Sequence, residues 1–239
     1  MGASRPWPAL LAISALALVF AVIAGVSASA AGSELTRGPN AAEVRQAAAD
    51  EVARRWWIWP AGRIFPGSLP YVAEQGGMEK ALRVGVSTRT SCSAAVDEAL
   101  RRALRDAGCE AVLRATYLDA LEGVVVTIGL AVFPDHMRAA AAQRVFPRAG
   151  RASPGLRALA FPGTVADRFT AAGRQYSYSR QAGPYVVVVT AGQVDGRPAR
   201  AVGRQRDTLF SFTVDLADRV LTTISTPVNP DCSAKEWRC

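Results

Sequence analysis

The residue types that most often carry out chemistry are sparse in this chain. His136 is the single histidine, and Asp135 precedes it in the sequence PDHMR. Adjacent side chains at the start of a helix do not share a face, so this pair does not provide the base and orienting acid of a triad. We therefore expect His136 to be an exposed residue in the first turn of a helix.

Motifs for nucleophilic or metal-assisted catalysis are absent. HExxH, GxSxG and P-loop patterns do not occur, and neither Lys80 nor Lys235 has a serine three residues earlier. A hydrolase built on paired carboxylates needs no motif and stays as an alternative. The sequence predicts a protein that is not an enzyme, with no catalytic residue and no cofactor.

The carboxylates themselves give this alternative little support. Residues 136–206 hold only Asp167 and Asp195, and Asp195 belongs to an Asp-Gly pair typical of a turn. Asp97 and Glu98 stand where the start of a helix favours negative charge. We expect these acids to be structural.

Four cysteines follow the N-terminal apolar segment. The CxxC spacing that would suggest a metal site does not occur among them. An even number in an oxidising compartment predicts two disulfides with three connectivities. We favour Cys92–Cys109 and Cys232–Cys239 because each pair is local. A straight helix between the first two would hold their Cα atoms ~20 Å apart, beyond the ~7 Å limit of a disulfide. The helix should therefore begin near Asp97.

The positive charge is unevenly distributed. The chain has a formal net charge of +8, yet residues 34–135 carry twelve basic and thirteen acidic side chains, whereas residues 136–206 carry twelve arginines and two acids. Such an excess favours anionic partners. No nucleic-acid recognition motif occurs, so we expect anionic wall or lipid groups or an acidic protein. The candidate surface residues are Arg138, Arg144, Arg148, Arg151, Arg157, Arg197, Arg200 and Arg204.

An uncharged apolar segment from Ala9 to Gly32 is long enough to cross a bilayer. We assign residues 9–31 to a transmembrane anchor and residues 1–8 to a short cytoplasmic N-terminus. A cleavable signal peptide is the alternative, because Ala28-Ser29-Ala30 fits a cleavage site. Both alternatives export the rest of the chain, so we expect a single-pass cell-membrane protein with an extracytoplasmic C-terminal domain.

Three tryptophans in RRWWIWP end the first predicted helix, which spans residues 40–57 after a linker at residues 32–39. Asn40 and Glu43 predict a capping box. Trp56 continues the apolar stripe and should be core, while Trp57 should be at least half buried. Trp59 lies beyond the helix, and with Arg54 and Arg55 it is the candidate for partner contact.

The remaining pattern predicts an α+β fold, an antiparallel sheet with helices packed on one face. Hairpins are expected at 110–133 and 174–192, each between helices, and VVVTIG at 124–129 matches VVVTAG at 187–192. This indicates a duplicated αββα unit or a chance match of Val-rich strands. Gly129 and Gly192 within these strands predict a bulge or a close backbone approach. The domain should cover residues 40–225, followed by a Cys-containing tail at 226–239.

The stretches CSAAVDEALRRALRDAGCEAVLRATY, VVVTIGLAVFPD and GPYVVVVTAGQVDGRP resemble an uncharacterised group of single-pass exported proteins of high-GC Gram-positive bacteria. The resemblance covers residues 40–224. It implies location and gross organisation and no activity. The spacing of Cys92 and Cys109 is also similar to exported sensor domains of receptor-like Ser/Thr kinases, although this chain has no kinase domain.

Together these features predict a non-catalytic, membrane-anchored domain that is an accessory or scaffolding component of an envelope or secretion assembly. The alternative is a ligand-binding or sensor module for anionic wall or lipid groups. An exposed apolar patch with scattered charges would favour the first. Arginines converging on one concave surface would favour the second.

Overall fold

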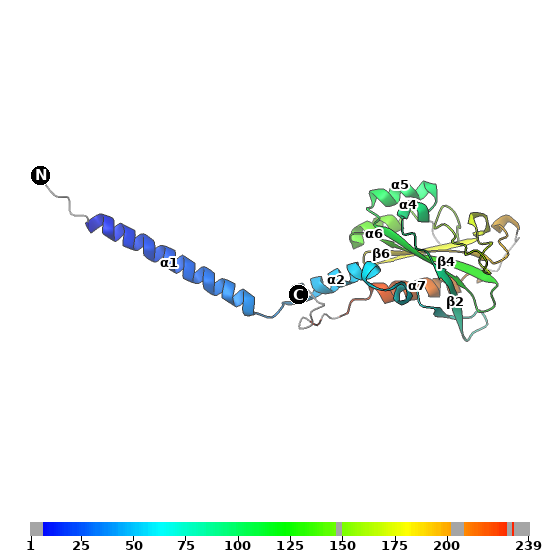
Figure 1. Cartoon of the computed structure of the whole chain (residues 1–239), viewed down its shortest axis with the longest axis horizontal. Helices are drawn as coiled ribbons and strands as arrows, with labels where there is room; N and C mark the ends of the chain where they lie inside the picture. The colour runs from blue at the N-terminus through cyan, green and yellow to red at the C-terminus, as the bar shows by residue number, and fades with distance from the viewer. Residues whose placement is uncertain (1–6, 147–149, 202–207, 229–230, 232–239) are drawn as a thin grey trace. The chain divides into compact units, whose positions relative to one another are not determined.

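The computed structural model of the chain describes residues 7–146, 150–201, 208–228 and 231. The chain divides into two units, one of residues 1–46 with 230–239 and one of residues 47–229. Figure 1 shows the apolar N-terminal helix in the first unit and the sheet with its helices in the second. Of the second predicted disulfide, Cys232 and Cys239 lie outside the described residues.

Helix α1 (Trp7–Thr36) contains a stretch, Leu11–Glu34, that is long and apolar enough to span a membrane. At 1.5 Å per residue its 24 residues extend ~36 Å, more than the ~30 Å of a hydrocarbon core. Its large apolar side chains, Phe20 among them, are exposed. The length and composition predicted for the anchor are thus present in one continuous helix.

Helix α2 (Ala41–Ile58) begins with the predicted capping box. The Asn40 side-chain oxygen accepts hydrogen bonds from the N–H groups of Ala42 and Glu43, at 2.9 and 3.0 Å. In return, the Glu43 carboxylate accepts the N–H of Asn40 at 2.8 Å. Free N–H groups of the first turn are thereby satisfied from both directions, which fixes where the helix starts.

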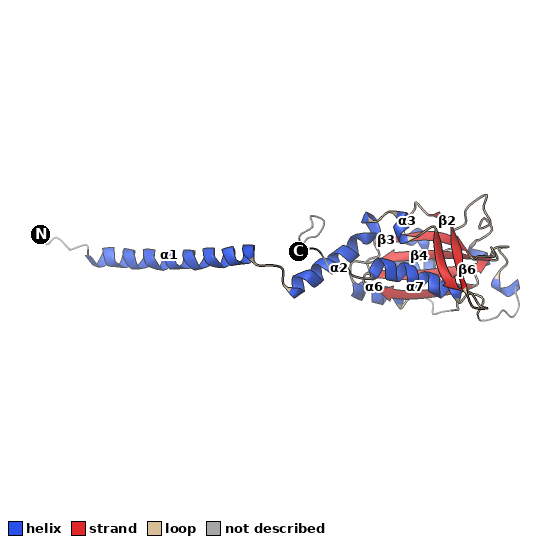
Figure 2. Ribbon diagram, turned by 90° about the horizontal axis from the view of Figure 1, so that it is seen from below, coloured by secondary structure: helices blue, strands red, loops and turns tan. Residues whose placement is uncertain are grey.

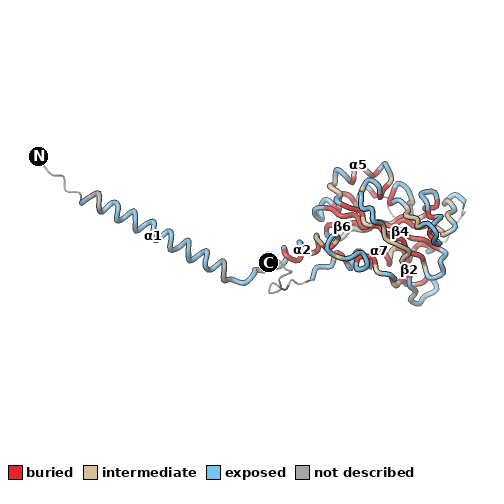
Figure 3. Tube along the Cα trace, viewed as in Figure 1, coloured by how far each residue is buried: buried red, intermediate tan, exposed pale blue. Residues whose placement is uncertain are grey.

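The described strands form one antiparallel sheet in the order β1-β2-β3-β4-β6-β5. Three hairpins build it, and β4 pairs with β6 to join the second hairpin to the third. In Figure 3, β4 and β6 are buried along their length, as expected of apolar central strands. The strands are β1 (Ser68–Val72), β2 (Met78–Val86), β3 (Ala111–Leu118), β4 (Val124–Val132), β5 (Tyr176–Ala182) and β6 (Tyr185–Gln193).

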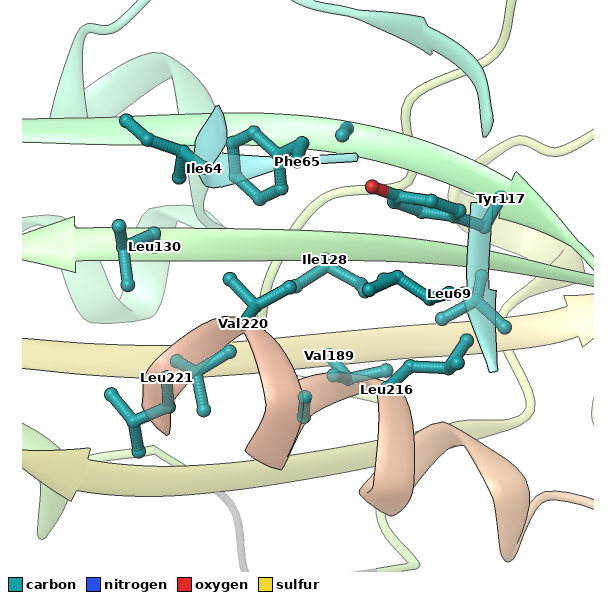
Figure 4. Packing of buried hydrophobic residues seen from close by; sticks show 14 of the residues in the cluster. Ile64, Phe65, Leu69, Tyr117, Ile128, Leu130, Val189, Leu216, Val220 and Leu221 are labelled. Carbon is teal, nitrogen blue, oxygen red and sulfur yellow. The ribbon is translucent and has the colours of Figure 1, made fainter. Parts of the chain in front are cut away.

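One face of the sheet, here called the α7 face, packs against α7 (Phe212–Ser225), α3 (Ala61–Ile64) and the end of α2. Alternate residues of each strand point to it, as Ile128 of β4 does. Figure 4 shows Leu216 and Val220 of α7 next to Ile128 and Val189 of the sheet. This is the larger of the two main apolar clusters.

The opposite face, here called the α5 face, packs against α4 (Cys92–Ala95), α5 (Glu98–Asp106) and α6 (His136–Gln143). Helices therefore cover both faces of the sheet, as Figures 1 and 2 show, and the expectation of helices on one face was wrong. Fully apolar central strands permit this arrangement, because neither of their faces is polar.

The Cys92–Cys109 disulfide is present, and the helix break that it requires lies at Asp97, as predicted. Helix α4 ends at Ala95, Asp97 precedes α5, and Gly108 stops α5 with a positive φ of 77°. The Cys109 N–H donates to the Leu104 carbonyl, as in a Schellman motif. This reversal brings the cysteine Cα atoms within 6.4 Å.

The two matched strand sequences lie side by side, with Thr127 directly opposite Thr190. The elements around them differ. The helix expected before the second hairpin is not present, because residues 164–173 form turns followed by the short 3-10 helix η1 (Ala171–Gly173). In addition, α6 packs on the α5 face and α7 on the α7 face. The two halves therefore share strands and not a repeated αββα arrangement.

Residues 153–173, here called the strap, cross the α5 face of the sheet. Their side chains and backbone occupy the space above strand glycines, since an added Cβ at Gly129 would lie 2.6 Å from the side chain of Leu156. A Cβ at Gly192 would lie 2.0 Å from the carbonyl oxygen of Gly173. The close backbone approach predicted for these glycines is confirmed at Gly192, whereas at Gly129 the close neighbour is the side chain of Leu156.

Candidate functional site

The predicted arginines are distributed over several segments. Arg138 and Arg144 belong to α6 or its end, Arg151 and Arg157 lie in or beside the strap, and Arg197 and Arg200 follow β6; all six are exposed. Arg148 and Arg204 lie outside the described residues. Two of these arginines are neutralised locally, because Arg138 pairs with Asp135 and Arg197 pairs with Asp195.

An open depression of about 410 Å³ lies on the surface formed by the end of the strap and the segment after β6. It brings together Asp167 and Asp195, the two acids of residues 136–206, beside Arg168. Hydrogen bonds from Arg197 hold the pKa of Asp195 below its ordinary value, so this carboxyl is not a proton donor near neutral pH. None of the six described candidate arginines lines the depression.

Asp135 caps α6, since its side chain accepts the N–H of Arg138 at 2.8 Å. His136 is exposed in the first turn of that helix, where the sequence placed it. Within the described ranges, no cluster of three or more His, Cys, Asp or Glu residues is arranged to hold a metal ion. His136 therefore has a helix-surface position with no constellation around it.

The tryptophan segment differs from its prediction. Arg55 is 1% exposed, and its Nη1 donates to the carbonyl oxygens of Ile224 and Thr226, at 2.9 and 2.8 Å, at the end of α7. A side chain used in this way is not available to a partner. Its place on the buried side of α2 follows from the helical spacing with Val52, which the pattern of apolar residues alone did not include.

The burial of Trp57 and Trp59 is also the reverse of what was expected. Trp57 is 63% exposed, where at least half burial was expected, and Trp59 is half-buried with Arg63 over its ring at 3.6 Å. Arg54 is half-buried and donates to the Asp50 carbonyl. Trp57 and not Trp59 is therefore the outward ring of this segment.

Sequence reasoning missed an exposed apolar surface on the first hairpin. Val72, Met78 and Leu82, here called the hairpin strip, are 54%, 62% and 53% exposed. Val72 and Met78 are cross-strand partners, and Leu82 lies four residues along the same strand as Met78, so all three point to one side. Leu82 pairs with Leu118, which places the strip on the α5 face. Residues 60–77 are rich in proline and glycine, which is typical of a loop, so the alternation in SLPYV was the signal left unused.

A second missed feature is Arg114, an arginine in the middle of central strand β3. It is 6% exposed, and its Nε is buried without a hydrogen-bond partner. The signal in the sequence was one charged residue between apolar neighbours in a predicted strand.

Comparison of the chain with protein-family models, with curated proteins and with solved structures gives no match.

Proposed function

We propose that this protein is a non-catalytic domain, anchored by its N-terminal helix at the outer face of a membrane, that serves as an accessory component of an envelope assembly. The observation that carries the proposal is the hairpin strip. Apolar side chains gathered on one exposed sheet surface mark a docking site for another protein more often than they serve the folded monomer. The described candidate arginines of residues 136–206 are spread over several segments, which favours docking over a ligand groove lined by these residues.

The position of the strip supports a docking role. On the α5 face the described helices contact β3, β5 and β6. The hairpin strip lies on β1 and β2, which are outside the area that these helices contact. Its far side is well supported, because Tyr71 of β1 packs against Phe212 of α7 with ring centroids 4.8 Å apart. A partner would therefore meet a rigid ribbon whose outer apolar side chains need no rearrangement.

Anchorage is supported by α1 and by the disulfide. Residues 11–34 can cross the bilayer by length and composition, and structural disulfides persist in oxidising compartments. Sequencing the mature N-terminus of the membrane fraction tests this part. A soluble form that begins at Ala31 would contradict anchorage and favour a cleaved signal peptide.

Photo-crosslinking in intact cells tests the docking surface. The full chain would carry benzoylphenylalanine in place of Met78, and the matched control would carry it in place of Arg102, whose side chain is 93% exposed on α5. We expect a discrete protein adduct from position 78 and none from position 102. Introducing Val72→Glu and Leu82→Glu should remove the adduct while the melting temperature stays unchanged, because both side chains are already exposed.

Two results would contradict the proposal. Equal adducts from both positions would mean non-specific proximity. Adducts with lipid alone at position 78 would mean that the strip contacts the membrane surface and not a protein.

A further inference from the structure

Arg114 lies in a position that is costly for a charged side chain. Its Nη1 donates to the carbonyl oxygen of Arg157 at 3.5 Å, which is at the limit of a hydrogen bond, and its buried Nε donates to nothing. A buried donor without an acceptor costs about 1–3 kcal/mol, and more when the group is charged. The buried Nε of Arg114 therefore lacks a hydrogen-bond acceptor in the folded protein.

The strap creates this environment. The cross-strand partner of Arg114 is Gly129, and Leu156 of the strap occupies the space above that glycine. The next strap residue, Arg157, is held by its N–H to the Ala95 carbonyl at 2.8 Å. Arg114 is thus enclosed by the sheet below and by strap backbone beside it.

Two exposed arginines border the buried one. Arg89 lies on the segment that runs alongside β3, because Ser87 N–H donates to the Arg114 carbonyl and Val112 N–H donates to the Thr90 carbonyl, both at 2.8 Å. Arg157 lies beside Arg114 because its carbonyl oxygen accepts the hydrogen bond from Arg114 Nη1. Burial is the largest cause that lowers the pKa of Arg114. The positive charges of Arg157 and Arg89 are close enough to lower this pKa further.

No described carboxylate balances these three charges. In the parts of the chain that the structure describes, none of the ion pairs includes Arg89, Arg114 or Arg157. The other buried arginines differ in this respect, since Arg55 pairs with Glu51 and Arg174 pairs with Asp97. Burial of unpaired positive charge is tolerated where an external anion completes the site.

We propose that Arg89, Arg114 and Arg157 form a binding site for a phosphate group. Three guanidinium groups that come from three chain segments offer donors from several directions. A carboxylate has two oxygens in one plane and is matched by one guanidinium fork, whereas phosphate has three or four oxygens in a tetrahedron and up to two charges. Arg114 is the inner donor, and the two exposed arginines form the rim.

This site is separate from the proposed docking surface, because it lies on β3 and the strap and not on the hairpin strip. Of its members, Arg157 alone belongs to the basic segment identified in the sequence. The phosphate group can come from a free ion or from a lipid headgroup, and the chemistry at the three arginines is the same.

Thermal unfolding of the full chain in neutral detergent tests the site. Inorganic phosphate should raise the melting temperature in a saturable way, measured against sodium chloride at matched ionic strength. Arg114→Met should abolish this rise, whereas Arg144→Met, which removes an exposed arginine outside the cluster, should retain it. Arg114→Met should also melt no lower than the natural chain without phosphate, because the substitution removes an unpaired buried charge.

A second measurement avoids dependence on the buried substitution. The rim variant Arg89→Met/Arg157→Met changes exposed side chains and should fold normally, and isothermal titration with inorganic phosphate should give at least tenfold weaker binding than the natural chain. A lipid arm uses mixed micelles that contain phosphatidic acid, with diacylglycerol as the matched control. Arginine-dependent stabilisation by phosphate or by phosphatidic acid supports the site and identifies the source.

Three results would overturn the proposal. One is the absence of stabilisation by either phosphate source. Another is equal stabilisation by acetate, which would assign a carboxylate site. The third is a phosphate effect that persists undiminished in both the Arg114 and the rim variants, which would reflect general anion binding to a basic protein.

Discussion

Arg174, two residues before β5, binds Asp97, the residue before α5, through two hydrogen bonds, from Nη1 to Oδ2 at 2.8 Å and from Nη2 to Oδ1 at 3.2 Å. The pair also holds the strap, because Asp97 accepts the Gly155 N–H at 2.9 Å and Arg174 donates to the Leu156 carbonyl at 2.9 Å. Three segments that are distant in the sequence are therefore joined at one largely buried ion pair.

Replacing Asp97 with alanine should destabilise the domain severely. The substitution leaves the Arg174 guanidinium largely buried without its carboxylate, and breaking such a pair costs about 3–5 kcal/mol. Urea unfolding of the full chain in detergent measures the loss. The matched control is Asp106→Ala, which removes an exposed pair with Arg102 at 3.7 Å and should cost less than about 1 kcal/mol. Equal losses for the two variants would refute the central role of Asp97.

Acid should weaken the same interaction. Burial alone raises the pKa of Asp97, but hydrogen bonds from Arg174, from the Gly155 N–H and from Ser153 outweigh burial and lower the pKa below its ordinary value. A carboxyl with a lower pKa in the folded state stabilises the fold above its unfolded pKa, near 4, and this stabilisation is lost as the pH falls through the folded pKa.

The stability difference between the natural chain and Asp97→Asn should therefore be constant from about pH 5 to 7 and shrink below about pH 4. Urea titrations at a series of pH values measure it. A difference that is unchanged at the most acidic pH at which both proteins still fold would show that the negative charge of Asp97 contributes nothing.

The helix break at Asp97 could be predicted from the sequence, whereas the ion pair of Asp97 with Arg174 could not. The disulfide geometry and the helix-start preference together located the break at this residue, because both depend on neighbours within a few positions. Its partner Arg174 could not be predicted, since the ion pair exists only after the strap and β5 have folded against α5. The Asn40–Glu43 capping box and the Gly108 stop were predictable for the same local reason.

Burial at α2 was less predictable, again for a physical reason. Hydrophobic periodicity assigns arginine to the outside, but the guanidinium of Arg55 satisfies free carbonyls at the end of α7, a contact 169 residues away. Because Trp57 is two residues from Arg55 on the same helix, it lies on the opposite, exposed side. The hairpin strip was missed because β1 follows a Pro/Gly-rich stretch that reads as loop.

The tight contact at Gly192 predicts a large effect from a single methyl group. In Gly192→Ala the new Cβ would lie 2.0 Å from the backbone oxygen of Gly173, which cannot move without displacing η1. We expect a loss of more than about 3 kcal/mol, the upper end for overpacking. Gly123→Ala is the control, because nothing lies within 4 Å of its added Cβ. Comparable melting temperatures for the two variants would contradict the close strap contact.

Removing the Cys92–Cys109 disulfide should destabilise the α5 face selectively. The bond closes a loop with a sequence separation of 17, for which the loss of chain entropy in the unfolded state corresponds to about 3 kcal/mol. In the Cys92→Ala/Cys109→Ala variant, α4 and α5 keep their buried residues Ala95, Leu100 and Leu104 but lose their covalent link to the start of β3. Amide hydrogen exchange should therefore accelerate most in α4 and α5, while the interior strands, β4 and β6 among them, stay the most protected elements because they pair on both sides. Uniform acceleration across the sheet would instead mean that the disulfide stabilises the whole domain equally.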